Sequence, residues 1–429
     1  MLAGGAITGA ALGATRVPHV AGSDKIKIGL IGCGARGTAA AIQAIDTQFL
    51  GAQSGEVRLV AMGDVFENHM QSAYRTLKSK HSKQLDVKDT RFVGFDAYKK
   101  VLESDADVVL LATPPGFRPL HFEAAVEAGK HIFMEKPVAT DAAGVRRVLA
   151  ANELAKQKGV AVQVGLQRRH ERRYRECITR LQQGAIGDLL FARAYWCGGG
   201  MIVKPRADRQ SELEYQMRNW KSFTWLCGDH INEQHIHNLD VINWLVDAHP
   251  IEAQGVGGRE VQQGNEHGQT YDHHMIEYTY SNGFKLLSQC RHMKGCWNSV
   301  SEHVHGTKGT SDISNALIRD MVGKRIWQSD AQEARGRGWQ QEHQNFFSAL
   351  RRGDLPNEGD YGARSTMTAI LGRLATYSGK VVKWNSAIKN ETQLADTGSL
   401  RSFDDPAPVL PDASGAYPVP VPGSKTPLA

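Results

Sequence analysis

Residues 25–37 read KIKIGLIGCGARG, and this stretch decides the fold class of the chain. A short apolar run passes directly into a G-x-G-x-x-G turn, and an alanine-rich helical pattern follows at 38–45. This order of strand, turn and helix is the context in which the fingerprint indicates dinucleotide binding. Gly32 permits the tight turn, Gly34 lets the backbone approach a pyrophosphate, and Gly37 lets helix and strand pack closely.

The start of the helix after the turn supplies groups that bind anions. The first backbone N–H groups of a helix have no partner inside it, so those of Ala35 and Arg36 are available to a phosphate. The alternative is a glycine-rich turn in an α/β protein that binds nothing. The strand before the turn and the helix after it favour the dinucleotide site.

Apolar runs alternate with helical patterns through the first 167 residues, which is typical of a doubly wound parallel sheet in an α/β domain. We expect strands at 25–31, 57–63, 91–94, 107–112, 131–134 and 160–166. We expect helices at 37–46, 66–80, 95–103, 119–128 and 141–158. These elements form a Rossmann domain at 24–167.

An acidic residue, Asp64, follows the second expected strand. A carboxylate at this place hydrogen-bonds the adenosine ribose hydroxyls, which favours NAD over NADP. The distance from the fingerprint exceeds the usual ~20 residues, and we attribute the excess to a loop insertion at 48–56. The alternative is a solvated aspartate at the end of a strand.

The pattern changes from about residue 185, where long alternating runs appear at 188–197, 250–261, 270–281, 283–293 and 299–305. They predict an open, mostly antiparallel β-sheet, with an Asn-Gly hairpin signal at Asn282. Helices are expected at about 339–352 and 360–377, the second packing back on the first domain. We assign 168–390 to a substrate and oligomerisation domain, and 391–429 to a Pro- and Gly-rich tail that wraps the surface or stays mobile.

The composition excludes several classes of protein. The chain has 429 residues, 41% hydrophobic and 22% charged, which is ordinary for a soluble globular protein. Its net charge of +6 is modest and scattered, so nothing argues for a nucleic-acid partner. The densest basic run, 168–175, predicts a solvated helix face or else a contact with an anionic ligand. The 6 cysteines show no C-x-x-C spacing and are expected to be free thiols.

The first residues, 1–14, are apolar and small, but too short to span a bilayer as a helix. They resemble the apolar region of a secretory signal, although the first positive charge is Arg16. We therefore expect 1–23 to be a signal segment of twin-arginine type whose start lies upstream, and the protein to be periplasmic or secreted. The alternative is a leader of no consequence on a cytoplasmic protein.

The fifth expected strand ends in FMEKP at 133–137, which places Lys136 at the carboxyl edge of the sheet where ligands bind. A lysine near a cationic nicotinamide and partly desolvated has a lowered pKa, which suits proton transfer near neutrality. Pro137 is expected to fix the backbone of the lysine through a cis bond. The alternative is a surface lysine at the end of a strand.

These features together resemble the glucose–fructose oxidoreductase/inositol dehydrogenase (Gfo/Idh/MocA) family. The resemblance rests on the fingerprint, on ATPP at 112–115, on AGKHIFMEKP at 128–137 and on the later sheet, and it covers about 25–385. The ending GKVVKW at 379–384 is similar to that of signal-bearing members. The resemblance implies pyridine-nucleotide redox chemistry on a sugar or polyol hydroxyl, with Lys136 as a catalytic lysine.

The family's second catalytic element is an Asp-x-x-x-His segment that leads into a helix ending in Trp. Here His237 matches the histidine, and the positions of Asp240 and Trp244 support the alignment. Glu233 stands where an aspartate is usual, which puts the orienting hydrogen bond in doubt. The resemblance implies that His237 is the general base and that Lys136 stabilises the charge on the same oxygen.

The remaining candidates follow from position. Thr113, Pro114, His121 and Glu135 are assigned to cofactor binding beside the expected strand ends. Arg168, Trp196, Asn232 and His237 are assigned to substrate binding, with Arg206, Trp220 and Trp225 as further candidates. A metal site built from His230, Glu233, His235 and His237 is the alternative, completed by His273 or His274. We expect no metal, because residues two apart on a helix point in different directions.

The sequence therefore predicts an NAD(H)-dependent oxidoreductase acting on a sugar, polyol or glycoside. One rival is a glycosidase that oxidises its substrate transiently with a retained NAD, and another is a dinucleotide-binding sensor without catalysis. An open sheet of the predicted kind pairs with other copies, so we expect a homo-oligomer, either a dimer or a tetramer.

Overall fold

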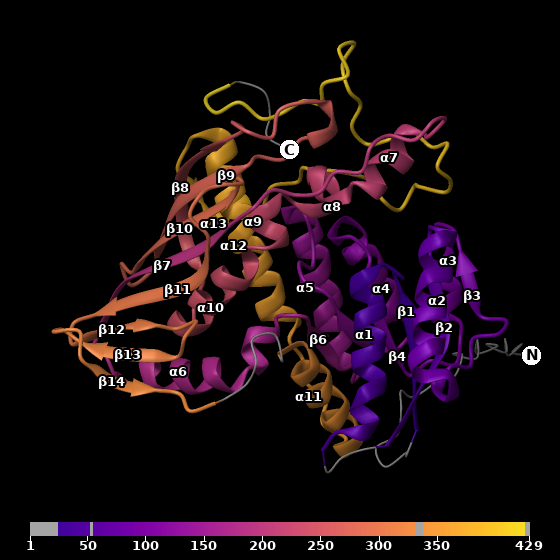
Figure 1. Ribbon diagram of the computed structural model, residues 1–429, viewed down its shortest axis with the longest axis horizontal. Helices are drawn as coiled ribbons and strands as arrows, with labels where there is room; N and C mark the ends of the chain where they lie inside the picture. Colours follow the sequence, from indigo (N-terminus) through magenta and orange to yellow (C-terminus); the bar gives the residue numbers. More distant parts are fainter. Residues whose placement is uncertain (1–24, 52–54, 332–337, 425–429) are drawn as a thin grey trace, which may run out of the picture.

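The computed structural model describes residues 25–51, 55–331 and 338–424. Two β-sheets, each covered by helices, lie beside one another (Figure 1). The predicted signal segment, 1–23, lies outside the described residues. None of the helices in the described ranges is long and apolar enough to cross a membrane.

The first sheet is parallel throughout, with the strand order β3-β2-β1-β4-β5-β6. Its strands are β1 (Lys25–Ile31), β2 (Glu56–Asp64), β3 (Arg91–Val93), β4 (Val108–Leu111), β5 (His131–Met134) and β6 (Val162–Val164). Its helices are α1 (Ala35–Asp46), α2 (Glu67–His81), α3 (Ala97–Leu102), α4 (Arg118–Glu127) and α5 (Ala142–Gln157). The order reverses between β1 and β4, which creates the crevice where doubly wound sheets bind ligands. The predicted parallel sheet is confirmed.

The second sheet has the order β14-β13-β12-β11-β7-β10-β9-β8-β15 within the described chain. Its long strands are β7 (Leu189–Gly198), β8 (Pro250–Gly258), β9 (His273–Tyr280), β10 (Lys285–His292) and β11 (Ser299–Gly306). All neighbours are antiparallel except β7 and β10. Side chains of β10 alternate between buried and half-buried, so one face packs on helices and the other is open. The mostly antiparallel sheet is confirmed.

Four short strands were not expected. They are β12 (Gly309–Asp312), β13 (Leu317–Asp320), β14 (Arg325–Gln328) and β15 (Val382–Lys383). Each contains four residues or fewer and is rich in polar side chains, so it offers too few positions for a period-two pattern to be recognised. The strands β12, β13 and β14 extend the sheet beyond β11, and β15 extends it beyond β8.

Helices of the second half cover the inner face of this sheet and connect it to the first domain (Figure 1). The helix α12, predicted to pack back on the first domain, contacts α5 and β6 there, and α10 and β8 on its other side. The helices are α6 (Arg172–Gln182), α7 (Glu212–Arg218), α8 (Thr224–Cys227), α9 (His230–Glu233), α10 (Ile236–Val246), α11 (Gly338–Arg352), α12 (Gly359–Ser378) and α13 (Trp384–Ala387). Single 3₁₀ turns are η1 (Thr47–Phe49), η2 (Ser82–Gln84), η3 (Pro115–Phe117), η4 (Gln167–His170), η5 (Trp220–Ser222) and η6 (Asn265–His267).

The plainest interpretation of the basic run at 168–175 predicted a solvated helix face. The structure differs, because two of its arginines form ion pairs with distant carboxylates. Arg168 forms a buried ion pair with Glu302, and Arg169 pairs with Asp240 at 2.8 Å. Both carboxylates come from elements distant in sequence, β11 and α10. Such partners leave no local pattern, which is why sequence alone missed them.

A separate apolar cluster, here called the third core, lies between the loops of the first sheet, the α7–α8 segment and the C-terminal tail. It lies apart from the two larger clusters that surround the sheets. The yellow tail in Figure 1 runs over α7 and α8 at this place. Its buried members include Phe66, Phe117, Leu213, Met217, Trp225, Leu400, Ala407 and Tyr417.

Candidate active site

A cleft of about 530 Å³ opens at the carboxyl ends of β1, β2, β4 and β5. It lies where the order of the parallel strands reverses, and residues of the second domain form its opposite wall. Most of the residues predicted from the sequence line it. They are Gly32, Gly34, Ala35, Arg36, Asp64, Thr113, Pro114, His121, Glu135, Lys136, Trp196, Glu233 and His237.

The fingerprint turn is built as the sequence predicts. Gly32 has a φ of +98°, and a Cβ there would lie 2.7 Å from the backbone of Thr113. A Cβ on Gly37 would lie 1.8 Å from the carbonyl oxygen of Gly32, so only glycine lets α1 approach β1 this closely. A Cβ on Gly34 would meet nothing within 4 Å, because this residue faces the cleft. The turn therefore leaves room for a ligand beside the start of α1.

Asp64 ends β2 with its carboxylate held by two backbone donors. The N–H of Cys33 donates to Oδ2 at 2.6 Å, and the N–H of Phe66 donates to Oδ1 at 2.7 Å. These bonds join the fingerprint turn to the loop after β2. Asp64 lines the cleft, and each carboxylate oxygen can accept a further hydrogen bond, for which a ribose hydroxyl is a suitable donor.

The loop after β4 forms the floor of the cleft. Thr113 Oγ1 lies 3.1 Å from His121 Nδ1, and the imidazole packs on the ring of Tyr98 at 4.4 Å between centroids. Burial lowers the pKa of His121 to about 3. The imidazole is therefore neutral, and it contributes shape and hydrogen bonding rather than charge.

Glu135 and Arg36 form a charged pair beside the turn. Arg36 Nε donates to Glu135, its Nη1 donates to Gln43 at 2.7 Å, and Nη2 lies 3.4 Å from Glu342 Oε1. Glu342 comes from α11 of the second half. The pair thus links the start of α1 to both domains at the edge of the cleft.

Lys136 projects from the end of β5, and its peptide bond to Pro137 is cis, as predicted. Its Nζ donates to the backbone carbonyl of Glu233 and lies 3.8 Å from the carboxylate oxygen Oε1 of the same residue. Burial lowers the pKa of Lys136, and this effect exceeds the opposing effect of the Glu233 and Glu135 carboxylates. Lys136 and Glu233 are thus in contact with each other in the lining of the cleft.

His237 lies in the first turn of α10 and lines the same cleft. Its ring is parallel to that of Trp196 within 23°, at 6.0 Å between centroids. Burial holds the pKa of His237 well below its ordinary value, and the positive charges of Lys136 and Arg168 lower it further. The imidazole is therefore neutral and can accept a proton.

Four of the candidate substrate-binding residues do not lie among the residues that line the cleft: Arg168, Asn232, Arg206 and Trp225. Arg206 pairs with Glu212 at 2.7 Å, and Trp225 is buried in the third core. Arg168 is buried against Glu302, and Tyr174 donates a further hydrogen bond to the same carboxylate at 3.2 Å. Asn232 donates from Nδ2 to the carbonyls of Ala139 and Cys227. Asn232 therefore joins the two domains, whereas the ion pair of Arg168 lies within the second domain.

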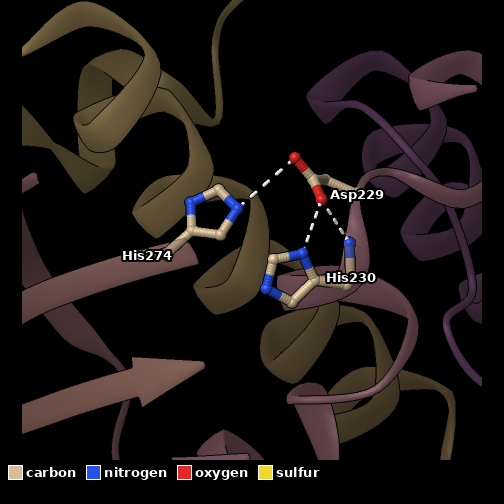
Figure 2. Close-up of side chains that lie close together, drawn as sticks. All are labelled: Asp229, His230 and His274. Carbon is tan, nitrogen blue, oxygen red and sulfur yellow. Dashed lines mark hydrogen bonds and ion pairs between the residues drawn. The ribbon is translucent and has the colours of Figure 1, made fainter. Parts of the chain in front are cut away.

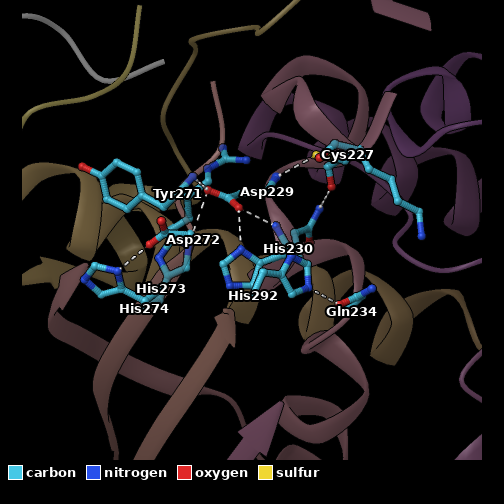
Figure 3. Close-up of polar contacts among 12 residues, drawn as sticks. Cys227, Asp229, His230, Gln234, Tyr271, Asp272, His273, His274 and His292 are labelled. Atoms are coloured by element: carbon cyan, nitrogen blue, oxygen red, sulfur yellow. Dashed lines mark hydrogen bonds and ion pairs between the residues drawn. The ribbon is translucent and has the colours of Figure 1, made fainter. Parts of the chain in front are cut away.

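The structure adds residues that the sequence did not single out. Lys221 lies 3.6 Å from Glu233 Oε1, so this carboxylate stands between two lysines. Gln234 lines the cleft next to it, and its Oε1 lies 2.6 Å from His292 Nε2 (Figure 3). The adjacent wall is formed by the aromatic rings of Phe66, Phe95 and Tyr98. No motif marks these residues, because they reach the cleft from loops, from the turn η5 and from the start of α3.

The proposed metal alternative, with His230, Glu233, His235 and His237, is split apart by the fold. His235 lies 2.7 Å from Ser288 Oγ, away from Glu233 and His237 in the cleft wall. Only Asp229, His230 and His274 bring ligand atoms within 4.8 Å of one another among the described residues (Figure 2). His274, one of the two histidines named for that alternative, lies beside His230, whereas Asp229 was not among the candidates.

The contacts of Asp229 fit a hydrogen-bonded network (Figure 3). His230 Nδ1 lies 2.9 Å from Oδ1, while Tyr377 Oη and the N–H of Tyr271 donate to Oδ2 at 2.7 and 2.9 Å. His274 Nε2 lies 3.3 Å from the same Oδ2. Burial raises the pKa of Asp229, but the charge and hydrogen bonds of His274 and His230 outweigh it and hold that pKa well below its ordinary value. The network anchors the start of α9, which carries Glu233 into the cleft.

Comparison with known proteins agrees with this geometry. A family model described as "Oxidoreductase family, NAD-binding Rossmann fold" matches residues 26–166, and one described as "Oxidoreductase family, C-terminal alpha/beta domain" matches residues 200–366. The inositol 2-dehydrogenase of Acidothermus cellulolyticus is 29% identical over 234 residues, 54% of this chain and 57% of that protein. The inositol 2-dehydrogenase of Gluconacetobacter diazotrophicus is 29% identical over 167 residues, 39% of this chain and 43% of that protein. The chain thus spans about half the length of these relatives.

Solved structures share the fold over a longer range. Apo scyllo-inositol dehydrogenase from Lactobacillus casei has a TM-score of 0.63 at 20% identity, and covers 84% of this chain and 98% of its own. Levoglucosan dehydrogenase in complex with NADH and levoglucosan has a TM-score of 0.63 at 18% identity. The match covers 84% of this chain and 99% of that chain. With both domain models matched over more than half of its length, the chain belongs to the Gfo/Idh/MocA oxidoreductase family.

Proposed function

We propose that this chain is an NAD(H)-dependent oxidoreductase that acts on a hydroxyl of a sugar, a polyol or a glycoside. The observation that carries the proposal is that Lys136 and His237 line the same cleft as the fingerprint turn. Relatives named inositol 2-dehydrogenase and a structural neighbour that binds NADH and levoglucosan support the substrate class.

The cleft fits a dinucleotide. The side of Gly34 that a Cβ would occupy is open, while Gly32 and Gly37 are closed in by backbone. The N–H groups at the start of α1 would hold the pyrophosphate, and Asp64 would hold the adenosine ribose. A carboxylate at Asp64 repels the 2′-phosphate of NADP, which favours NAD. When bound, NAD⁺ supplies the hydride acceptor.

The proton chemistry belongs to His237 and Lys136. The neutral imidazole of His237 accepts the proton of the substrate hydroxyl. The ammonium group of Lys136 donates a hydrogen bond to the same oxygen and stabilises the negative charge that develops there. Because both side chains are buried, this charge interaction is less screened than it would be in water.

Neighbouring residues orient this pair and the substrate. The carbonyl of Glu233 accepts the hydrogen bond that fixes the ammonium group of Lys136. Trp196 and Trp220 line the cleft and offer apolar faces on which a sugar ring can stack. The carboxylate of Glu233 is an acceptor for a substrate hydroxyl beside them.

The experiment is a comparison of Lys136→Ala and His237→Asn with the wild type, in the formation of NADH from NAD⁺. The substrates tried are myo-inositol, scyllo-inositol and levoglucosan, and NADP⁺ replaces NAD⁺ in a parallel series. We expect each variant to lose about 10²- to 10⁴-fold in kcat, as is typical when a general acid or base is removed. NADH binding is expected to change little.

His303→Asn is the matched control, because His303 lies on β11 outside the lining of the cleft. Full activity in Lys136→Ala would refute the proposed mechanism. If the wild type formed no NADH but cleaved glycosides with NAD still bound after purification, the oxidation would be a transient step of a glycosidase. Denaturing the purified protein and measuring released NAD(H) distinguishes the two.

A further inference from the structure

The C-terminal tail lies beyond both family matches, the second of which ends at residue 366. Its described part, 391–424, is nevertheless built into the structure. The N–H of Leu394 donates to Asp141 Oδ2 at 2.9 Å, and Gln216 Nε2 donates to the carbonyl of Val409 at 2.6 Å. Leu400 and Ala407 are buried in the third core. The tail is therefore bound to both domains along its length.

A tight turn in the tail fixes one aromatic residue, Phe403. The carboxylate of Asp405 accepts hydrogen bonds from the N–H groups of Arg401 and Ser402, the second at 2.9 Å. These bonds close residues 401–405 into a compact loop and hold the pKa of Asp405 below its ordinary value. Phe403 lies inside this loop, so its position is set by the backbone.

Phe403 packs against two rings of the cleft wall. Its ring stacks on Phe66 at 5.1 Å between centroids, with 19° between the ring planes. It meets Phe95 edge to face at 5.3 Å. Arg218 also lies over the ring of Phe66, with its guanidinium carbon 4.2 Å from the centroid. Phe66 and Phe95 line the cleft, whereas Phe403 lies behind them.

These rings stand at one end of the cleft. In a bound dinucleotide the pyrophosphate would lie at the fingerprint turn, and the nicotinamide would lie near Lys136 and His237. Phe66 is two residues beyond Asp64 and donates its N–H to that carboxylate. The wall formed by Phe66 and Phe95 is therefore at the end that would take the adenosine of a dinucleotide.

We propose that Phe403 is a positioning residue of the cofactor site: it holds Phe66 and Phe95 as the walls against which adenosine packs. The inference rests on the proposed function and deepens it, because it assigns part of the affinity for NAD to the C-terminal tail. Loss of Phe403 frees both rings to adopt other rotamers. The adenosine must then restore their order at the expense of binding affinity.

The test uses the full chain with Phe403→Ala and measures the binding of NADH and of ADP-ribose by titration calorimetry. Because the ligand must order two rings that Phe403 otherwise holds in place, we expect both ligands to bind about tenfold more weakly. ADP-ribose lacks nicotinamide, and an equal loss for both ligands therefore places the effect at the adenosine end. Phe403→Tyr keeps the ring and is expected to restore binding.

Leu410→Ala is the matched control, since Leu410 is in the same tail but 62% exposed. It is expected to bind both ligands as the wild type does, and thermal unfolding of all three variants reports any loss of folding. Unchanged binding of both ligands in Phe403→Ala would overturn the inference while leaving the proposed function intact. Weaker binding of NADH with unchanged binding of ADP-ribose would overturn it too. If the wild type bound neither NADH nor ADP-ribose, the proposed function would fail as well.

Discussion

The pKa values of Lys136 and His237 are both lowered by the cleft that the two side chains line. Burial lowers the pKa of both side chains, because in each case the protonated form carries the charge. At neutral pH the consequences differ. His237 is neutral and accepts a proton, whereas the ammonium group of Lys136 loses its proton more readily than that of a lysine in water.

The pH dependence of kcat/KM follows from these shifts. Activity requires unprotonated His237, so the acid limb should lie below the ordinary histidine pKa of about 6.5. It also requires protonated Lys136, so the alkaline limb should lie below about 10.4. In Lys136→Arg the guanidinium stays charged, and we expect residual activity to lose its alkaline limb. An acid limb above the ordinary histidine value would contradict the assignment of His237.

At the scale of elements, the start of α9 depends on Asp229. This residue has a φ of +71° and ψ of 165°, a backbone conformation that side-chain-bearing residues rarely adopt. Its buried carboxylate compensates through the donors from His230, Tyr271 and Tyr377. Because α9 carries Glu233, whose carbonyl accepts a hydrogen bond from Lys136, the unusual backbone conformation of Asp229 lies close to the proposed catalytic lysine.

Asp229→Asn keeps the size of the side chain but removes the charge that these donors face. We expect a loss of about 2–4 kcal/mol in the free energy of unfolding, measured by urea denaturation. Ser211→Ala is the control, because Ser211 also begins a helix and accepts from the N–H of Glu214. Ser211→Ala should lower the free energy of unfolding by only about 1 kcal/mol. An equal cost for both variants would show that Asp229 acts as an ordinary helix cap.

The same elements show what a sequence can predict about this fold. The parallel strands, the fingerprint turn and Lys136 follow from local periodicity and spacing, and the structure has each of them in place. Arg168 and Asn232 were assigned to substrate binding from their positions in the sequence. Their actual partners, Glu302, Ala139 and Cys227, are set only by the folded chain, so no local pattern could reveal them. The role of Phe66 was missed for the same reason.

At the scale of the whole molecule, each domain supplies a wall of the cleft. Members of the third core, among them Phe66, Phe117 and Met217, also line it. The first domain supplies the turn and Lys136, and the second supplies Trp196 and His237. The third core joins them through residues from the loops after β2 and β4, the α7–α8 segment and the tail (Figure 1). In the part of the chain that the structure describes, helices cover one face of the second sheet and leave the opposite face open (Figure 1).

That open face predicts association between copies of the chain. Val256 on β8 and Met275 on β9 are paired across the sheet, yet they are 68% and 46% exposed. Burying such side chains against a second copy removes apolar area from water, which is the main driving force for association. We expect a dimer or tetramer in size-exclusion chromatography with light scattering, and a smaller species for the double variant Val256→Lys/Met275→Lys. Val322→Lys is the control, because Val322 is 89% exposed in the turn between β13 and β14. A monomeric wild type would contradict this prediction, and an unchanged mass in the double variant would place the interface elsewhere.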